Sequence, residues 1–345
     1  MRKQDVRSMT MDEMELLMGE LGEPRFRAKQ LFDWVQKKKA KSFDEMTNLS
    51  KALREKLKET CKISRVEIAR TLVSEKDGTT KYLFTLENDK QIEAVLMRYG
   101  YGNAVCISTQ VGCRMGCRFC ASTLDGVEGN LTAGEMLSQV FAIGDAIGER
   151  IGSIVLMGSG EPLDNYDQVL RFLHLIHDER GQGLSQRHIT LSTCGLIDRI
   201  RDLKQEHLQI TLAVSLHAPN DEIRNELMPI SRKNPMDQLL RACKEYGDET
   251  KRRVTFEYAL IRGVNDQREH AQELASRLHN MLCHVNLIPI NTVKERQFYP
   301  PSEEVISAFA QTLQERGIET TVRRKLGSDI NAACGQLRKS ERNRR

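Results

Sequence analysis

The segment Cys113–Cys120 constrains this chain more than any other part of its sequence. It holds three cysteines, Cys113, Cys117 and Cys120, in a short basic loop that also contains Gly116. A structural zinc site usually takes four Cys or His ligands, and no histidine adjoins this loop. Three thiols in a polar loop also make a poor hydrophobic core. Three thiolates do suit a cubane iron–sulfur cluster in which one iron has no protein ligand and stays open to a small molecule.

The spacing C-x3-C-x2-C, with Phe119 just before the last cysteine, resembles the signature of the radical S-adenosylmethionine (SAM) superfamily. In that superfamily SAM binds the open iron of a 4Fe-4S cluster, and its reductive cleavage gives methionine and a 5′-deoxyadenosyl radical. The resemblance implies Cys113, Cys117 and Cys120 as metal ligands, with one 4Fe-4S cluster and SAM as cofactors. The alternative is a group of core or zinc-binding cysteines.

Length and composition describe an ordinary soluble protein. The 345 residues allow one large domain and one small one, and 39% hydrophobic with 29% charged residues is typical of globular chains. No apolar run approaches the roughly 20 residues that span a bilayer, and the first residues lack a secretory signal. We therefore expect a cytoplasmic protein without a membrane partner, whose nine cysteines serve metal binding or catalysis rather than a disulfide framework.

From about residue 102 strand and helix patterns alternate, which indicates parallel strands joined by helical crossovers. Six such units predict a partial (βα)6 barrel, because a complete eight-unit barrel needs more chain. The expected strands are 104–109, 153–157, 188–192, 210–215, 253–260 and 284–288, with an edge strand at 319–323. The expected helices are 133–147, 166–176, 195–203, 236–246, 269–279 and 303–316.

The fold class predicted is therefore α/β, a partial barrel preceded by a small helical domain and connecting antiparallel strands. Helical patterns at 11–21, 26–38 and 51–60 define an N-terminal domain of residues 1–62. Strand patterns at 66–73, 81–86 and 91–97 define a small β extension of residues 63–101. The barrel is expected at 102–325, and a loop with a basic tail at 326–345. The helical domain and the tail are either a plain cap and a solvated end, or contacts to nucleic acid.

Polar residues follow several of the expected strands, where parallel barrels carry their chemistry. In Gly158–Pro162 the glycines allow a close backbone approach, and Glu161 can accept hydrogen bonds from an ammonium group. This turn resembles the superfamily motif that holds the SAM amino group, although Ser159 replaces the usual Met, an exchange that leaves the backbone role intact. The other residues are Ser192, Ser215, Leu216, His217 and Asn291, and each is either a helix cap or turn residue or part of a ligand cup.

Two further cysteines have a suggestive context. Cys106 lies on the first barrel strand, and Cys334 lies between Gly327 and Gly335 in a loop with small neighbouring residues. An accessible thiol near positive charge ionises readily and becomes a nucleophile. The remaining cysteines have no such context and are interpreted as core thiols: Cys61, Cys194, Cys243 and Cys283.

Taken together, the motifs resemble the RlmN/Cfr family of radical SAM RNA methyltransferases. The resemblance covers nearly the whole chain and is carried by residues 92–98, 106–113 and 215–220 and by the Ala-Ala-Cys-Gly-Gln-Leu loop around Cys334. It implies that one SAM methylates Cys334 and that a second SAM supplies a radical that activates this methyl group for addition to adenine. It further implies Glu93 as general base and Cys106 as the thiol that forms a transient disulfide with Cys334. Residues expected to contact SAM are Gly160, Glu161, Ser192, Ser215, Leu216, His217 and Asn291.

The resemblance implies 23S rRNA and tRNA as partners, an electron donor such as flavodoxin or ferredoxin, and a monomer. The target would be C2 of an adenine in the peptidyl-transferase region of 23S rRNA and of the adenine next to the anticodon in some tRNAs. Residues 158–163 and 293–296 favour C2 over the Cfr-type reaction at C8 of the same rRNA adenine. A second alternative is a non-catalytic, metal-stabilised RNA-binding protein.

Overall fold

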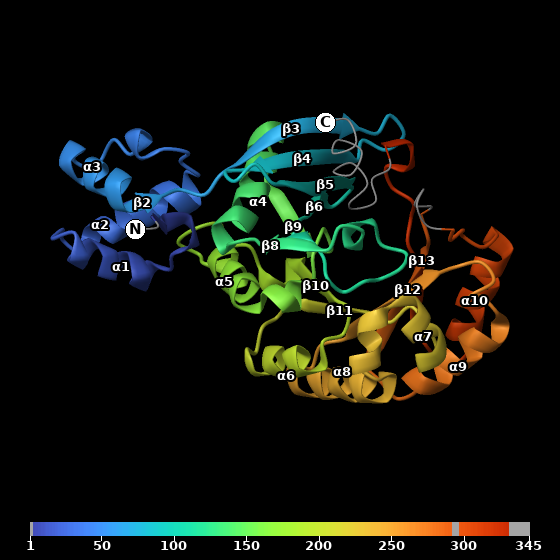
Figure 1. Ribbon diagram of the computed structural model, residues 1–345. Coiled ribbons are helices and arrows are strands. Elements are labelled where there is room, and N and C mark those ends of the chain that lie inside the picture. Colours follow the sequence, from blue (N-terminus) through green and yellow to red (C-terminus); the bar gives the residue numbers. More distant parts are fainter. Residues whose placement is uncertain (1–2, 292–296, 331–345) are drawn as a thin grey trace.

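One ten-stranded sheet runs through most of the chain in the computed structural model, which describes residues 3–291 and 297–330 (Figure 1). The strand order is β14-β13-β12-β11-β10-β9-β6-β5-β4-β3. Every neighbouring pair from β6 to β14 is parallel, and every neighbouring pair from β3 to β6 is antiparallel. The sheet therefore changes from antiparallel to parallel pairing at β6.

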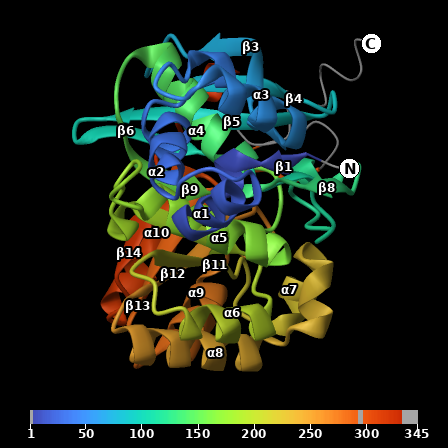
Figure 2. The same cartoon turned by 90° about the vertical axis from the view of Figure 1, so that its left-hand side faces the viewer.

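The parallel part confirms the predicted partial barrel. Its strands are β6 (Gly102–Cys106), β9 (Ile151–Leu156), β10 (Ile189–Thr193), β11 (Thr211–Ser215), β12 (Val254–Leu260), β13 (Cys283–Pro289) and β14 (Thr320–Val322). Its helices are α4 (Ala133–Ile147), α5 (Tyr166–His177), α6 (Ile197–Gln205), α7 (Asp221–Leu227), α8 (Met236–Thr250), α9 (Arg268–Leu278) and α10 (Glu303–Glu315). Helices α6 and α8 lie together below the strands in both views (Figures 1 and 2).

The antiparallel strands are β3 (Val66–Val73), β4 (Thr80–Leu86) and β5 (Gln91–Tyr99). They were expected to form a small antiparallel sheet that leads into the barrel. In the structure β5 pairs with β6 over five residues, with Val95 opposite Cys106, so the extension continues the barrel sheet. Residues of β5 and β6 therefore share one surface.

Several short elements were not predicted from the sequence. These are the pair β1 (Gln4–Asp5) with β2 (Cys61–Lys62), the hairpin of β7 (Gln110–Gly112) with β8 (Val127–Asn130), and helix α7. Strands of two to four residues are too short to show a hydrophobic period. The predicted helix over 26–38 is also divided, because α2 (Phe26–Phe32) continues as a π-helical segment over Asp33–Lys37.

The N-terminal lobe contains α1 (Met11–Glu20), α2 and α3 (Lys51–Thr60), and it projects from the barrel in Figure 1. Thr10 and Glu13 form a capping box at the start of α1, and the Ser50 side chain caps α3. Each helix buries its apolar side, including Met14, Leu31 and Leu53. Within the described ranges, no helix is long and apolar enough to cross a membrane.

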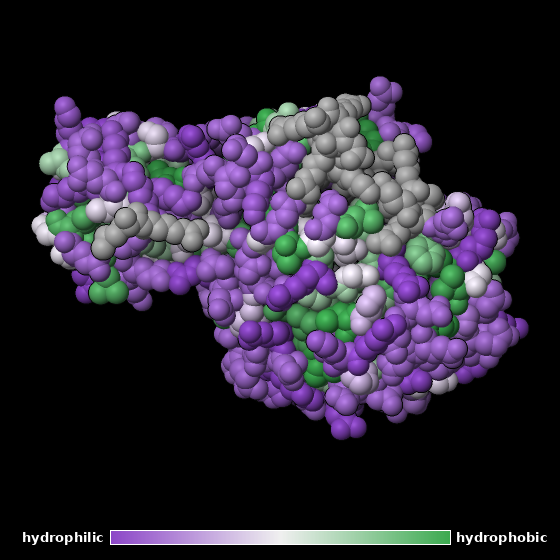
Figure 3. Space-filling model, viewed as in Figure 1, coloured by the Kyte–Doolittle hydropathy of each residue, from purple (hydrophilic) through white to green (hydrophobic). Residues whose placement is uncertain are grey.

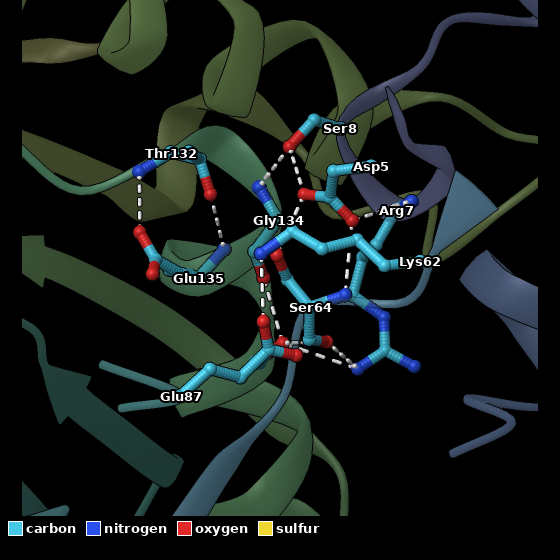
Figure 4. A network of polar contacts seen from close by, with 10 residues as sticks. Asp5, Arg7, Ser8, Lys62, Ser64, Glu87, Thr132, Gly134 and Glu135 are labelled. Carbon is cyan, nitrogen blue, oxygen red and sulfur yellow. Dashed lines mark hydrogen bonds and ion pairs between the residues drawn. The ribbon is translucent and has the colours of Figure 1, made fainter. Parts of the chain in front are cut away.

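A buried polar network joins this lobe to helix α4 of the barrel (Figure 4). The Asp5 carboxylate accepts hydrogen bonds from the Ser8 and Ser64 hydroxyls at 2.6 and 2.7 Å. The Ser8 hydroxyl in turn accepts one from the Gly134 N–H at 2.8 Å. The Arg7 guanidinium donates to the Ser64 carbonyl at 2.8 Å, to the Ser138 hydroxyl and to the Ala40 carbonyl. Polar groups on both sides are thus hydrogen-bonded across the junction, although the buried Arg7 Nε has no partner among the described residues.

Arg7→Met is expected to lower the free energy of unfolding by about 3 kcal/mol or more, because it leaves buried acceptors without their charged donor. The Arg7 side chain is almost fully buried, and burial lowers its pKa to about 10, so the native group stays charged at neutral pH. Urea unfolding measures the change. Arg201→Met is the matched control, because the half-exposed Arg201–Asp198 pair should contribute less than about 1 kcal/mol. Equal losses in the two variants would contradict a structural role of Arg7 at the junction.

Candidate active site

A cavity of about 270 Å³ lies where the parallel strands end, and we call it the cluster cavity. Cys113, Cys117 and Cys120 form part of its wall. Other residues predicted to bind the cofactor also line it: Gly160, Glu161, Ser192, Ser215, His217 and Asn291. Figure 3 shows hydrophobic residues gathered near the middle of the same view as Figure 1, within a mostly hydrophilic surface. The fold thus brings together polar strand ends that lie far apart in the sequence.

The cysteine loop is held by backbone hydrogen bonds at several points. The Cys113 N–H donates to the Gly126 carbonyl at 2.9 Å, and the Arg118 N–H donates to the Leu227 carbonyl at 2.8 Å. Cys113 and Cys117 are buried, whereas Cys120 is half-buried. Burial raises the pKa of the Cys113 thiol to about 12 and that of Cys117 well above its usual value. Binding of a metal by these thiols therefore has to displace their protons.

This donor set fits a 4Fe-4S cluster. Three sulfur atoms face one cavity from a single anchored loop, whereas the fourth cysteine of the wall, Cys194, comes from a separate segment after β10. Among residues 3–291 and 297–330, no group of three His, Cys, Asp or Glu side chains is placed to hold one metal ion. Ligands that each bind a different iron of a cubane do not have to converge on one point.

The turn Gly158–Pro162 approaches its neighbours closely, as its glycines predict. A Cβ at Gly158 would lie 2.4 Å from the Ile107 carbonyl oxygen, and one at Gly160 would lie 2.6 Å from the Gln110 Cβ. Gly160 also has a φ of 109°, which other residues rarely adopt. The Ser159 carbonyl accepts hydrogen bonds from the Thr109 and Gln110 N–H groups, while its hydroxyl has no hydrogen-bond partner among the described residues. The backbone of Ser159, and not its hydroxyl group, therefore makes the hydrogen bonds that hold this turn.

Gly160→Ala is expected to lower SAM cleavage at least about tenfold, because the new Cβ must displace Gln110 and strain the turn by about 1–3 kcal/mol. Ser159→Ala is the matched control one residue away, and it should change cleavage less than about twofold. Formation of 5′-deoxyadenosine by the anaerobic, reconstituted protein measures both. A large loss in Ser159→Ala, or none in Gly160→Ala, would contradict the backbone role of this turn.

Glu161 lies at the end of this turn and is fully buried. Its carboxylate accepts hydrogen bonds from the Cys194 N–H at 2.7 Å and from the Leu163 N–H at 3.0 Å. Burial raises the pKa of Glu161, and these N–H donors oppose that rise by stabilising the charged form. A carboxylate held in this way beside the cluster cavity can receive a cationic ligand group.

His217 follows β11 in a left-handed backbone conformation, with φ 58°. Its Nδ1 accepts a hydrogen bond from the Ala259 N–H at 2.9 Å, which places the ring proton of the neutral form on Nε2. Burial, together with the charge of Arg224, lowers the pKa of His217 to about 3. The ring packs edge-on against Phe119, 4.9 Å between centroids. His217 is therefore a neutral wall residue rather than an acid at neutral pH.

Leu216 differs from the other residues predicted to bind SAM. It is fully buried and does not line the cluster cavity. Its N–H donates to the Glu257 carbonyl at 3.0 Å, so its backbone shapes the end of β11.

The wall residues that were not predicted as site residues include Cys194, Glu257 and Arg323. Cys194, interpreted as a core or incidental thiol, lies in a small hydrophobic cluster with Cys113 and Cys117, whereas Cys61, Cys243 and Cys283 lie in the main core. Glu257 is buried, its carboxylate accepts a hydrogen bond from the Asn286 amide at 2.8 Å, and burial raises its pKa. The position of Glu257 opposite Ser215 in the strand register is the signal that would have found it, but it requires the sheet order.

A second cavity of about 210 Å³ contains Cys106, and we call it the Cys106 cavity. Both cavities are lined by Met157, Ile288, Asn291 and Arg323, so they adjoin each other. Val95 and Met97 of β5 also line the Cys106 cavity, whose rim includes the basic residues 323–325. A thiol therefore lies next to the cavity that carries the cluster cysteines.

Glu93 lies on β5, two residues before Val95, and it does not itself line the Cys106 cavity or the cluster cavity. Its side chain is buried, and the Lys81 ammonium lies 2.9 Å from its carboxylate. The Glu93 carbonyl accepts a hydrogen bond from the Ser108 hydroxyl at 2.6 Å, and this hydroxyl accepts one from the Ser159 N–H at 2.9 Å. The backbone of Glu93 is therefore tied through Ser108 to the Gly158–Pro162 turn.

Cys334 lies outside the described residues, as do segment 293–296 and the basic tail. No two of the eight described cysteines form a disulfide with each other. The predicted pairing of Cys106 with Cys334 stays a prediction.

Comparisons with known proteins agree with this geometry. The profile of the radical SAM superfamily matches residues 107–275, which include the cysteine loop and most of the barrel. A solved radical SAM methyltransferase from Sphaerobacter thermophilus has 44% sequence identity and a TM-score of 0.92, covering 96% of this chain and 98% of that one. The fold and the site thus define a radical SAM enzyme, with one 4Fe-4S cluster and SAM as its cofactors.

The N-terminal lobe narrows the class further. Residues 4–63 match the profile of the ribosomal RNA large subunit methyltransferase N-terminal domain. A probable dual-specificity RNA methyltransferase RlmN from Alkaliphilus oremlandii is 55% identical over 339 residues, 98% of each chain. Its counterpart in Clostridium novyi is 52% identical over 336 residues, 97% of this chain and 98% of that one. The chain therefore belongs to the RlmN family of radical SAM RNA methyltransferases.

Proposed function

We propose that this enzyme methylates C2 of an adenine in the peptidyl-transferase region of 23S rRNA and of the adenine next to the anticodon in some tRNAs. The observation that supports this most is the wall shared by two cavities, one lined by Cys106 and the other by Cys113, Cys117 and Cys120. The C2 position of adenine is not nucleophilic, so a polar transfer from SAM to it cannot work. A site that joins a radical source to a thiol is suited to this reaction.

In the proposed mechanism Cys334 carries the methyl group. Its thiolate takes the methyl of one SAM as the sulfonium–carbon bond breaks, and S-adenosylhomocysteine leaves. The cluster, when bound by Cys113, Cys117 and Cys120, supplies the electron that cleaves a second SAM. The S-methyl group of Cys334 then loses a hydrogen atom, and its carbon bonds to C2 of the adenine. The RNA is now joined to the enzyme through this carbon.

Release of the product is assigned to Glu93 and Cys106. The adduct has to lose one electron, which the cluster held by Cys113, Cys117 and Cys120 would accept, and Glu93 takes the proton from C2. The Cys106 thiolate then bonds to the sulfur of Cys334 and breaks the sulfur–carbon bond. The released carbon takes a proton and becomes the methyl group, while the disulfide of Cys106 and Cys334 awaits reduction by a thiol.

The proposed SAM contacts are assigned from the residues at the wall of the cluster cavity. We assign binding of SAM to Leu216, which adjoins the wall, and to six residues of the wall, with Glu161 receiving the SAM amino group: Gly160, Glu161, Ser192, Ser215, His217 and Asn291. The described contacts support this, because Glu161 is held by two N–H donors and His217 is neutral.

RNA docking is assigned to the helical domain of residues 1–62, helped by the basic tail. Lys37 and Lys38 are exposed at the end of the second helical stretch, and the Lys38 ammonium lies over the Trp34 ring at 3.8 Å from its centroid. Such contacts to phosphates weaken with salt. The target base has to leave its stack to reach the cavities. We further propose a cytoplasmic monomer that receives electrons from a flavodoxin or ferredoxin.

The direct test is digestion of the modified RNA to nucleosides after reaction with the anaerobic, reconstituted protein. The proposal predicts 2-methyladenosine, identified by mass spectrometry against standards of 2-methyladenosine and 8-methyladenosine. 8-Methyladenosine would instead show the Cfr-type reaction. A protein with bound zinc, or with a cluster that forms no 5′-deoxyadenosine, would be the non-catalytic RNA-binding alternative.

A further inference from the structure

A buried lysine, Lys81, contacts the side chain of Glu93. The Lys81 Nζ atom is 2.9 Å from the Glu93 carboxylate, and the two side chains are 0% and 2% exposed. Such pairs are unusual, because lysine and glutamate are rarely buried completely. Packing alone therefore does not explain why Lys81 and Glu93 are buried together.

The strand register explains how the pair meets. Lys81 of β4 is opposite Val95 of β5, and Val95 is opposite Cys106 of β6. Side chains two residues apart on a strand share a face, so Glu93 lies on the same face as Val95. Lys81, Glu93, Val95 and Cys106 therefore belong to one face of the sheet, the face on which the Cys106 cavity lies.

The pair is a poor device for stability alone. Removing two charges from water costs several kcal/mol per ion, and hydrophobic residues of similar volume often stabilise a core equally well. What an ion pair does supply is a carboxylate held in a fixed orientation by a charge-assisted hydrogen bond. A general base needs such a fixed position relative to the proton that it removes.

Two contacts hold Glu93 in place. Lys81 binds its carboxylate, and the Ser108 hydroxyl binds its carbonyl at 2.6 Å. The first contact directs the side chain, and the second fixes the strand that bears it. Lys81 lies on the neighbouring strand β4, and Ser108 lies two residues after the end of β6.

We propose that Lys81 is a positioning residue for Glu93: its ammonium group holds the carboxylate in place on the face of the sheet that carries Cys106, so that removal of the C2 proton depends on it. This inference rests on the proposed function, in which Glu93 resolves the protein–RNA adduct. Lys81 itself touches neither SAM nor the adenine in this scheme.

The test is a single-turnover reaction of the reconstituted, anaerobic full-length protein with RNA, sampled on a denaturing gel. Lys81→Met is expected to slow decay of the protein–RNA adduct at least about tenfold, while the first-turnover yield of 5′-deoxyadenosine stays within about twofold of wild type. Lys81→Arg retains the charge and is expected to recover much of the decay rate. Because adduct decay is first-order, its rate constant does not depend on how much of a variant is folded.

The controls separate this inference from the proposed function. Glu93→Gln must accumulate the adduct; if it does not, the proposed role of Glu93 fails whatever Lys81 does. If Glu93→Gln accumulates the adduct while Lys81→Met resolves it at the wild-type rate, the inference about Lys81 alone is wrong. Lys81→Met could also form less 5′-deoxyadenosine and less adduct in equal proportion, while the adduct decays at the wild-type rate. That result would assign Lys81 a structural role only.

Discussion

Cys117→Ala is expected to abolish both iron binding and SAM cleavage. Cys117 is one of the three cysteines that the loop contributes to the wall of the cluster cavity, and two ligands do not hold a 4Fe-4S cluster. Loss of a group that only supports a metal ligand costs about 10–100-fold in affinity, so loss of the ligand itself should exceed that range. Iron content after anaerobic reconstitution and the yield of 5′-deoxyadenosine measure the two effects.

The matched control is Cys243→Ala. Cys243 is equally buried, but it lies on α8 in the main core and does not line the cluster cavity. This variant should keep wild-type iron content and SAM cleavage at a temperature where both proteins are folded. Iron retained in Cys117→Ala, or lost equally in both variants, would contradict the assignment of the loop cysteines as the cluster ligands.

Cys334→Ala is expected to abolish RNA methylation while leaving the cluster intact. Without this thiol there is no sulfur to carry the methyl group, and the radical has no S-methyl group from which to take hydrogen. Methylated RNA should fall below detection, whereas iron content should equal that of wild type. Unchanged turnover would exclude a methyl-cysteine carrier.

Cys106→Ala distinguishes the two thiols by the stage at which each acts. Cys106 lines its own cavity, next to the cluster cavity, and is assigned to release rather than to methyl transfer. This variant should form the protein–RNA adduct and retain it, so a shifted band should appear on a denaturing gel. The absence of an adduct would remove Cys106 from the release step.

The barrel could be predicted from the sequence because its strands and helices are long enough to show their periods. The strand expected at 253–260 is observed as Val254–Leu260, and the helix expected at 133–147 is observed unchanged. The pairing of β1 with β2 could not be predicted, because two residues show no period and their partners lie far apart in the chain. The continuity of the sheet through β5 and β6 also depends on long-range register.

The candidate site could be predicted only where a motif marks it. The cysteine spacing and the Gly158–Pro162 turn are local signals, and both segments line the cluster cavity. Glu257 and Lys81 carry no local signal, since a single charged residue in a strand pattern usually faces water. Their importance appears only when the register places Glu257 opposite Ser215 and the sheet buries Lys81 against Glu93.

The most direct test of the central claim is to supply SAM whose methyl group carries three deuterium atoms and to analyse both products by mass spectrometry. If the carbon travels through the sulfur of Cys334 and loses one hydrogen to the radical, the adenine methyl group should hold two deuterium atoms and one hydrogen. The 5′-deoxyadenosine should then hold the third deuterium. An adenine methyl group that retains all three deuterium atoms would show direct transfer and contradict the account.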